Sequence, residues 1–317
     1  MAHNRVAILG TGLIGASVGL GLKVARPQAQ VVGYDASGDN LRRAQAVKAI
    51  DRRASLREAL ADADLVIVST PVGAMKALFE EIAPLLPVEA LIMDTGSTKA
   101  RVLQWAAELL PTGVRFVGGH PMAGKTETGP DAADARLFQG AVWCLAPLPT
   151  TKRDAIDEAV QLVESFGASP YFLDPDEHDG LVASVSHLPY LISVALIRHL
   201  GREKSWRETA SVAAGGFAYS THLSDSDPQM FADIVRTNRD NIARRLDLYI
   251  AELESLRDAI AADSPELKAQ FEEARGLHQD WLAGRAQGHS AEGDNPLPTT
   301  RSMLTGSLFG RFGREKQ

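Results

Sequence analysis

Cysteine is almost absent from this sequence, with Cys144 the single one among 317 residues. One thiol excludes an intrachain disulfide and any zinc site built from several cysteines, and the apolar residues around Cys144 predict a packing role for it. A chain without disulfides is typical of a reducing compartment. We therefore expect a cytoplasmic protein.

Excess positive charge and long apolar runs are also missing. Lys and Arg total 33 against 40 Asp and Glu, which gives a formal net charge of -7, whereas a nucleic-acid-binding domain normally carries a basic face. No run approaches about 18 apolar residues, and the first residues lead directly into an expected strand, so the sequence predicts neither a membrane span nor a signal peptide. No cluster of metal-ligand residues stands out. We expect no nucleic-acid, membrane or metal partner.

A glycine-rich turn is the first motif that is present. An apolar run at residues 5–10 predicts a strand, and apolar residues recur at helical spacing over residues 13–25. The turn between them reads Gly10-Thr11-Gly12-Leu13-Ile14-Gly15. Gly10 allows a tight turn, Gly12 lets the backbone approach a pyrophosphate, and Gly15 lets the helix pack close to the strand. Because the helix N-terminus also offers free N–H groups, the pattern predicts a dinucleotide-binding site.

Asp35 indicates which dinucleotide. It follows an expected strand at residues 30–34, at the position where a carboxylate accepts hydrogen bonds from a ribose 2′-hydroxyl. The same carboxylate would repel the 2′-phosphate of NADP, so NAD is the expected cofactor. Arg42 and Arg43 lie a helical turn or two further on and would favour NADP if they faced the site. Their alternative role is a solvated helix face.

Strands and helices continue to alternate as far as residue 173. A strand at residues 65–68 ends at Ser69-Thr70-Pro71, and because Pro71 forces a turn, we expect these residues to edge the cofactor cleft. Further strands are expected at residues 90–93, 114–117, 141–147 and 171–173. Residues 1–174 are therefore predicted to form an α/β domain with a Rossmann-type, doubly wound sheet.

Two polar stretches follow neighbouring strands of this sheet, Asp94-Thr95-Gly96-Ser97-Thr98-Lys99 and Gly118-Gly119-His120-Pro121-Met122-Ala123-Gly124. Ligands bind beyond the carboxyl ends of parallel strands, so we expect Ser97 and His120 to converge on one pocket. Alternative roles are an N-cap of the helix expected at residues 100–110 for Ser97 or Thr98, and a turn histidine bonded to backbone for His120. The polar, glycine-bearing residues 125–140 are a candidate lid.

The pattern changes to helices alone after residue 174. Helical periodicity covers residues 178–200, 205–215, 227–258 and 265–282. We expect residues 175–284 to form an all-α substrate and dimerisation domain, because helical periodicity over residues 233–256 is long for a compact monomer. Residues 285–317 are rich in Gly, Ser and Pro with scattered charges and are expected to form a flexible tail.

These motifs together resemble the prephenate and arogenate dehydrogenases, the cyclohexadienyl dehydrogenases of tyrosine biosynthesis. The resemblance is based on the glycine turn, the 94–99 and 119–124 stretches and Ser186-His187-Leu188-Pro189, and it covers about residues 5–280 in order and spacing. It implies an NAD-dependent oxidative decarboxylation of a cyclohexadienol. His120 would remove the proton of the ring 4-hydroxyl as hydride leaves C4, and Ser97 would hold the hydroxyl or orient the imidazole.

The resemblance also implies substrate contacts from the helical domain, with two departures. The family's Ser-His-Leu-Pro-His segment ends here in Tyr190, a phenol that hydrogen-bonds but cannot become cationic, and a family arginine that pairs with a substrate carboxylate is replaced by His222. His187 is expected to line the site, and we interpret His178 as structural. Gly216 would approach the substrate of the neighbouring subunit of a homodimer.

The charge missing at His222 could come from another cation. Lys125, Arg236 and Arg239 are the candidates, although a solvated surface position is the more usual role for each of them. The loss of a bidentate arginine favours arogenate, or a dual preference, over strict prephenate recognition.

Two other classes of function are compatible with the pattern. One is a different Rossmann-type oxidoreductase with a helical second domain, such as a β-hydroxyacid dehydrogenase or an imine reductase. Those enzymes use a lysine or a tyrosine/aspartate early in the helical domain, where residues 176–193 offer histidines. The other is a non-enzymatic NAD sensor, against which the intact Ser97 and His120 argue.

Overall fold

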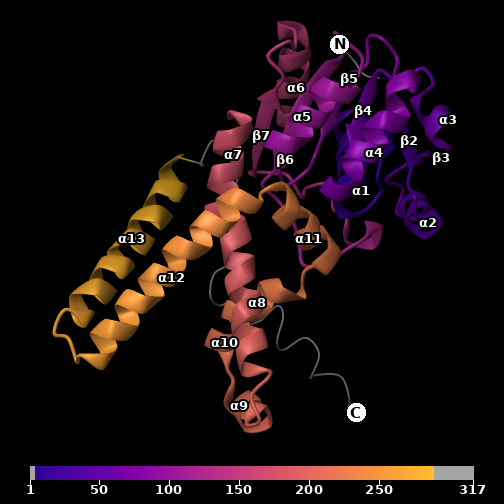
Figure 1. Cartoon of the computed structure of the whole chain (residues 1–317). Coiled ribbons are helices and arrows are strands. Elements are labelled where there is room, and N and C mark those ends of the chain that lie inside the picture. Colours follow the sequence, from indigo (N-terminus) through magenta and orange to yellow (C-terminus); the bar gives the residue numbers. More distant parts are fainter. Residues whose placement is uncertain (1–3, 289–317) are drawn as a thin grey trace, which may run out of the picture.

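Short apolar segments build a single eight-stranded sheet in the first part of the chain (Figure 1). The computed structural model describes residues 4–288. The strand order is β3-β2-β1-β4-β5-β6-β7-β8, and all neighbours are parallel except β6 and β7. The strands are β1 Arg5–Leu9, β2 Gln30–Tyr34, β3 Arg52–Arg53, β4 Leu65–Val68, β5 Leu91–Asp94, β6 Arg115–Pro121, β7 Val142–Pro147 and β8 Ser169–Phe172.

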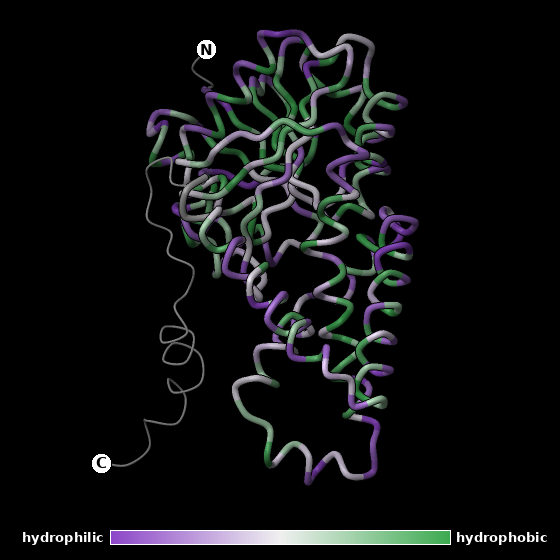
Figure 2. Tube along the Cα trace, turned by 90° about the vertical axis from the view of Figure 1, so that its left-hand side faces the viewer, coloured by the Kyte–Doolittle hydropathy of each residue, from purple (hydrophilic) through white to green (hydrophobic). Residues whose placement is uncertain are grey.

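Helices cover both faces of the sheet and bury two separate hydrophobic cores. One core holds residues of α1 and α6, and the other holds residues of α3, α4 and α5. The helices and short turns of this part are α1 Leu13–Ala25, α2 Gly38–Ala46, α3 Leu56–Leu60, α4 Val72–Ile82, η1 Ala83–Leu85, α5 Ala100–Leu109, η2 Pro130–Ala132 and α6 Arg153–Ser165. Residues of the central strands β1, β4 and β5 alternate between the two cores, so these strands are largely apolar. Figure 2 shows green, hydrophobic segments running through this part of the chain. The predicted Rossmann-type α/β architecture is confirmed.

Strand β6 differs from the prediction in a way that matters for the site. The sequence places His120 in a loop beyond the strand, but β6 continues to Pro121 and pairs antiparallel with β7, with His120 opposite Cys144. The antiparallel partner supplies hydrogen bonds that extend β6 past the parallel edge. His120 is therefore held by the sheet itself.

The candidate lid at residues 125–140 is anchored over part of its length. Phe138 is completely buried and packs against Trp143 and Phe166. The backbone N–H of Asp134 donates to Ser17 Oγ at 3.1 Å. The second half of this segment is part of the core, so the lid interpretation is wrong for it.

The second part of the chain is helical throughout the described residues. Its elements are α7 Pro175–Val182, η3 Ala183–His187, α8 Leu188–Leu200, α9 Trp206–Val212, α10 Gly215–Thr221, η4 His222–Asp225, α11 Pro228–Thr237, α12 Arg239–Ala261 and α13 Leu267–Gly288. Figure 1 shows α7 and α8 as one long rod and α12 and α13 side by side as a hairpin. Helix α13 runs four residues past the predicted boundary at 284. Residues 289–317, the rest of the expected tail, lie outside the described residues.

Two breaks interrupt helices that the sequence pattern predicts as continuous. The helix expected over residues 227–258 ends at Thr237, because Asn238 adopts a non-helical conformation (φ -124°, ψ 31°). Within the α7–α8 rod, η3 is a π-helical turn in which the Leu188 N–H bonds to Ala183 O. Pro189 explains this turn, since proline lacks an N–H and its ring clashes with the carbonyl four residues earlier.

The rod from Pro175 to Leu200 is long and apolar enough to cross a membrane by length and composition alone. The sequence shows no long contiguous apolar run here, because the rod mixes apolar residues with histidines and serines. Its first half contains the buried polar residues His178, Asp179 and His187. Its second half contacts η4 and α10. We therefore treat it as the central helix of the helical domain.

Candidate active site at the junction of the two domains

The glycine turn between β1 and α1 has an open face. Gly10 has a positive φ of +96°, and a Cβ at Gly15 would lie 1.9 Å from the carbonyl oxygen of Gly10, so both positions require glycine. A Cβ at Gly12 would meet no atom within 4 Å. No side chain caps the N-terminus of α1. Leu13 and Ile14, half-buried, start α1. Open space and uncapped N–H groups together fit a pyrophosphate.

Asp35 is fixed beside this turn. Its Oδ2 accepts hydrogen bonds from the Thr11 N–H at 2.7 Å and from Thr11 Oγ1 at 3.1 Å, and its Oδ1 accepts from the Ser37 N–H at 2.7 Å. These bonds hold a half-buried carboxylate at the end of β2, and lone pairs remain for a ribose hydroxyl. The end of β2 and the glycine turn therefore form one rigid unit.

Arg42 and Arg43 are engaged with acidic side chains. Arg42 pairs with Asp39 at 3.0 Å, and Arg43 pairs with Asp131 and with Asp39. The hydrogen bond that Arg43 donates to Asp131 raises the pKa of Arg43. These pairings favour the role of a solvated helix face.

The residues after β4 border the glycine turn. The backbone oxygen of Ser69 would lie 2.5 Å from a Cβ at Gly10, and Ser69 Oγ hydrogen-bonds Thr95 Oγ1 at 2.8 Å. Thr70 Oγ1 is buried without a hydrogen-bond partner among the described residues, and Pro71 is exposed. An unpaired buried hydroxyl at this edge is what a missing ligand would leave behind.

A buried ion pair ties the ends of β5 and β6 together. Lys99 and Asp94 are both 0% exposed and form a salt bridge. Lys99 Nζ also donates to Gly119 O at 2.6 Å, and Asp94 Oδ1 accepts from the Gly119 N–H at 3.1 Å. A Cβ at Gly119 would lie 2.5 Å from the backbone oxygen of Asp94. The backbone that precedes His120 is therefore fixed on both sides.

His120 is half-buried and faces the helical domain. Its Nδ1 lies 2.9 Å from Nε2 of His178, and His178 Nδ1 lies 2.8 Å from Asp179 Oδ1. Burial is the largest cause that lowers the pKa of His120 well below its usual value, and His178, Lys99 and His187 lower it further. His120 is therefore neutral near pH 7, as a base must be.

Asp179 also caps a helix of the sheet domain. Its Oδ1 accepts from the Lys99 N–H at 2.7 Å and its Oδ2 from the Ala100 N–H at 3.0 Å, at the first turn of α5. No side chain of the local segment caps α5, and Thr98 Oγ1 instead bonds Thr237 Oγ1 at 3.0 Å. The predicted N-cap by Ser97 or Thr98 is therefore wrong, because the cap comes from a residue 79 positions away. Ser97 is half-buried beside this turn.

His187 is locked in one tautomer by Asn238. The amide nitrogen of Asn238 donates to Asp179 O at 2.8 Å and to His187 Nδ1 at 3.2 Å. Because the carbonyl can only accept, the amide orientation is fixed, and the neutral ring carries its proton on Nε2. His187 Nε2 is buried and has no partner among the described residues. Burial lowers the pKa of His187 to about 4.

The other residues predicted to bind substrate occupy varied places. Tyr190 is 8% exposed and stacks on Phe231 of α11, and burial raises its pKa. Exposed His222 bonds Tyr219 O through Nδ1 at 2.6 Å. The turn η4, which contains His222, packs beside Ser193 of α8. Ser193 follows His187 by six residues, which corresponds to about 9 Å along an α-helix. Gly216 is exposed in α10. Within one chain, His222 and Gly216 are therefore not brought to His120.

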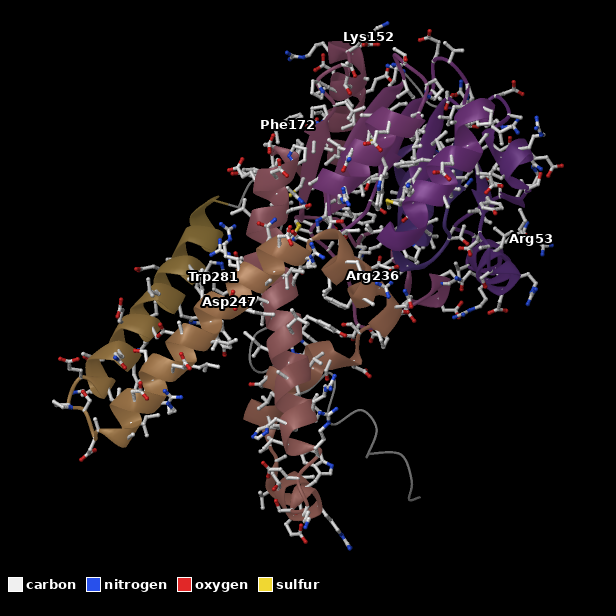
Figure 3. All side chains as sticks on the ribbon, in the orientation of Figure 1. Arg53, Lys152, Phe172, Arg236, Asp247 and Trp281 are labelled. Atoms are coloured by element: carbon white, nitrogen blue, oxygen red, sulfur yellow. The ribbon has the colours of Figure 1, made fainter. Side chains whose placement is uncertain are left out.

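The candidate cations are also spread out. Lys125 is exposed and donates to Ala132 O at 2.8 Å, and Arg239 pairs with Asp240. Arg236 lies on α11 near the domain junction (Figure 3) and pairs with Asp233 at 3.1 Å. The Asp233 carboxylate packs against Gly73 in the first turn of α4.

Sequence reasoning missed three participants: His178, Asp179 and Lys99. His178 was interpreted as structural, yet it is the hydrogen-bond partner of His120. The dipeptide His178-Asp179 at the start of a helix was the available signal, since a histidine beside a carboxylate is a common orienting pair. No group of three or more His, Cys, Asp or Glu within residues 4–288 could hold a metal ion.

A nucleotide-type sheet domain joined to a helical domain, with a histidine cluster where the two meet, is an arrangement typical of two-domain dehydrogenases. Residues 18–172 match the family model of the prephenate dehydrogenase nucleotide-binding domain, and residues 174–273 match the model of its dimerization domain. The chain belongs to the prephenate dehydrogenase family.

Individual relatives agree with this assignment. The chain is 33% identical to prephenate dehydrogenase of Bacillus subtilis over 90% of this chain and 78% of the relative. It is 34% identical to cyclohexadienyl dehydrogenase of Zymomonas mobilis over 86% of this chain and 94% of that relative. The solved structure of A. aeolicus prephenate dehydrogenase with hydroxyphenyl propionate and NAD+ superposes with a TM-score of 0.83 at 25% identity, covering 88% of this chain and 99% of that one.

The low pKa of His187 makes stability depend on pH. Above about pH 6.5 the ring is neutral in both the folded and the unfolded chain. As the pH falls from there towards about 4, the unfolded chain takes up a proton that the folded chain refuses, so stability is lost over this window. We expect the melting temperature of His187→Gln to fall less steeply between pH 6.5 and 4 than that of the unmodified protein.

A matched control for this measurement is His199→Gln, because the His199 side chain is 73% exposed. Its melting curve should follow the slope of the unmodified protein. Parallel slopes for all three proteins would contradict the assignment of His187 as a neutral, buried imidazole.

Proposed function

We propose that this protein catalyses the NAD-dependent oxidative decarboxylation of arogenate, prephenate or both, giving tyrosine or 4-hydroxyphenylpyruvate. The observation that carries the proposal is a half-buried, neutral imidazole, His120, at the edge of the sheet where ligands of this fold bind. Its Nδ1 is occupied by His178, so Nε2 is the atom left for the substrate. Family membership supplies the reaction class.

The residues of the first domain fit a bound NAD. The open face at Gly12, the uncapped start of α1, Asp35 and the unpaired Thr70 hydroxyl are the groups that would hold it. When bound, NAD accepts the hydride that leaves C4 of the ring. The role of the chain is to place that carbon beside the nicotinamide and to keep water out.

The proton of the ring 4-hydroxyl goes to Nε2 of His120. Hydride departs from C4 as the O–H bond breaks, and the C–C bond to the ring carboxylate then breaks with release of CO2, which leaves an aromatic ring. Lys99 is fully buried close to His120, and its charge helps keep the imidazole unprotonated before reaction. Ser97 would hold the hydroxyl or orient His120.

The helical domain would complete the substrate pocket. His187 presents a buried N–H without a partner among the described residues, which suits a substrate oxygen. Tyr190 adds a phenol where the family has a histidine. Of the three candidate cations, Arg236 is favoured as partner of a substrate carboxylate, because its own ion-pair partner Asp233 contacts the sheet domain. The absence of an arginine at His222 favours arogenate or dual use.

We further propose that the protein is a cytoplasmic homodimer. Large apolar side chains remain exposed on the hairpin within one chain, at Leu248 and Ile260 of α12 and at Phe271, Leu277 and Trp281 of α13. Figure 3 labels Trp281 on the hairpin of α12 and α13. A second copy would bury this surface and could bring Gly216 and His222 to the partner's substrate.

Steady-state kinetics with both substrates and both nicotinamide cofactors test the reaction. We expect NADH formation and CO2 release with arogenate, prephenate or both, and a clear preference for NAD. Absence of turnover with either substrate and either cofactor would remove the assignment.

His120→Asn tests the base. An amide cannot accept the proton, so we expect kcat to fall by roughly 10²- to 10⁴-fold, while the affinity for NAD stays nearly unchanged because the glycine turn is a separate part of the fold. The matched control is His199→Asn, at an exposed position near the end of α8. A near-normal kcat in His120→Asn would exclude His120 as the base.

Asp35→Ala tests the choice of cofactor. Removal of the carboxylate deletes both the ribose acceptor and the repulsion of a 2′-phosphate, so the ratio of kcat/KM for NAD to that for NADP should fall. Asp39→Ala, a nearby exposed carboxylate that pairs with Arg42, is the control. An unchanged ratio in Asp35→Ala would refute the role of Asp35.

A further inference from the structure

Three side chains from the two domains form a continuous series of hydrogen bonds. Asp179 Oδ1 and His178 Nδ1 are 2.8 Å apart, and His178 Nε2 and His120 Nδ1 are 2.9 Å apart. His178 is 0% exposed and Asp179 is 1% exposed. His120 comes from β6, and the other two come from the first helix of the second domain.

Chemistry fixes the direction of these bonds. A carboxylate only accepts, so the proton between Asp179 and His178 is on His178 Nδ1. In a neutral His178 the other nitrogen, Nε2, is then an acceptor, and His120 Nδ1 must donate to it. A neutral His120 with its proton on Nδ1 has its lone pair on Nε2, which is the form that a base needs.

Charged groups surround this series of hydrogen bonds. Lys99 already places one positive charge in the buried site, paired with Asp94. The Asp179 carboxylate is already met by two backbone N–H groups at the N-terminus of α5, where the helix dipole is positive. His187 from η3 and Cys144 from β7 are the other titratable groups facing this region. A series in which both rings are neutral adds no charge to this buried site.

We propose that His178 and Asp179 are positioning residues that hold His120 with its proton on Nδ1 and its lone pair on Nε2, an inference that rests on the proposed function. When Nε2 takes the substrate proton, His120 becomes an imidazolium with protons on both nitrogens. Its Nδ1–H continues to donate to His178, and the Asp179 carboxylate stabilises the new charge through the ring of His178. After product release the proton leaves from Nε2 to solvent, and His120 returns to its starting form.

Two substitutions at His178 separate this role from simple packing. His178→Phe keeps a ring but offers no acceptor, so His120 can adopt the other tautomer, and we expect kcat to fall by roughly 10²- to 10⁴-fold as when a catalytic histidine loses its orienting partner. His178→Gln can offer a carbonyl oxygen to His120 Nδ1, so most of that loss should be restored. KM should change little in either variant.

Glu177→Gln, an exposed neighbour in α7, is the matched control and should leave kcat unchanged. Melting temperature and NAD affinity identify a variant that has lost its fold. Near-normal kcat in both His178 variants, or an equal loss in folded Gln and Phe variants, would overturn the proposal.

A second measurement needs no turnover. In ring-15N-histidine protein, NMR should show His120 with a protonated Nδ1 and a bare Nε2, with the signal assigned by its loss in His120→Asn. His178→Gln should retain this tautomer and His178→Phe should lose it. A proton on Nε2 of His120 in the unmodified protein would overturn the proposal. If neither substrate reacts, the proposed function fails alone, and the tautomer still reports on His178.

Discussion

The Asp179 carboxylate is the contact on which the site depends. It belongs to the helical domain, yet it caps α5 of the sheet domain and bonds the ring that contacts His120. A carboxylate that accepts backbone N–H groups at a helix start stabilises that helix and is stabilised by its dipole. The same interaction therefore joins the two domains and contacts the ring that positions the candidate base.

Buried charge surrounds this contact and keeps it rigid. Lys99 and Asp94 are removed from water, and the loss of one partner of such a pair typically costs about 3–5 kcal/mol. Their bonds to the backbone of Gly119 hold the residue before His120. The site thus combines a fixed backbone, a fixed cation and a neutral imidazole, all at the junction of two domains. We interpret this rigidity as preorganisation for proton removal.

The sequence predicts the sheet domain well because the signals there are local. The glycine turn, the apolar strands and Asp35 each depend on neighbours within about one strand-turn-helix unit, and the structure places them together. The order of motifs also identifies the family, which both family models confirm. The change to helices after residue 174 follows in the same way from periodicity.

What the sequence could not predict arises from distant contacts. The cap of α5 comes from Asp179, and the break at Asn238 is accompanied by its bonds to Asp179 and His187. The extension of β6 through His120 depends on an antiparallel partner, β7. No periodicity or local propensity contains such information, so His178 was interpreted as structural and Ser97 or Thr98 as a cap.

A crystal structure of the protein with NAD and an aromatic product analogue tests the central claim most directly. We expect Nε2 of His120 within about 2.6–3.2 Å of the ring 4-oxygen, with the adjacent ring carbon facing the nicotinamide and Nδ1 still bonded to His178. A complex in which both nitrogens of His120 point into packed protein, away from the bound ring, would contradict the role of His120 as the base.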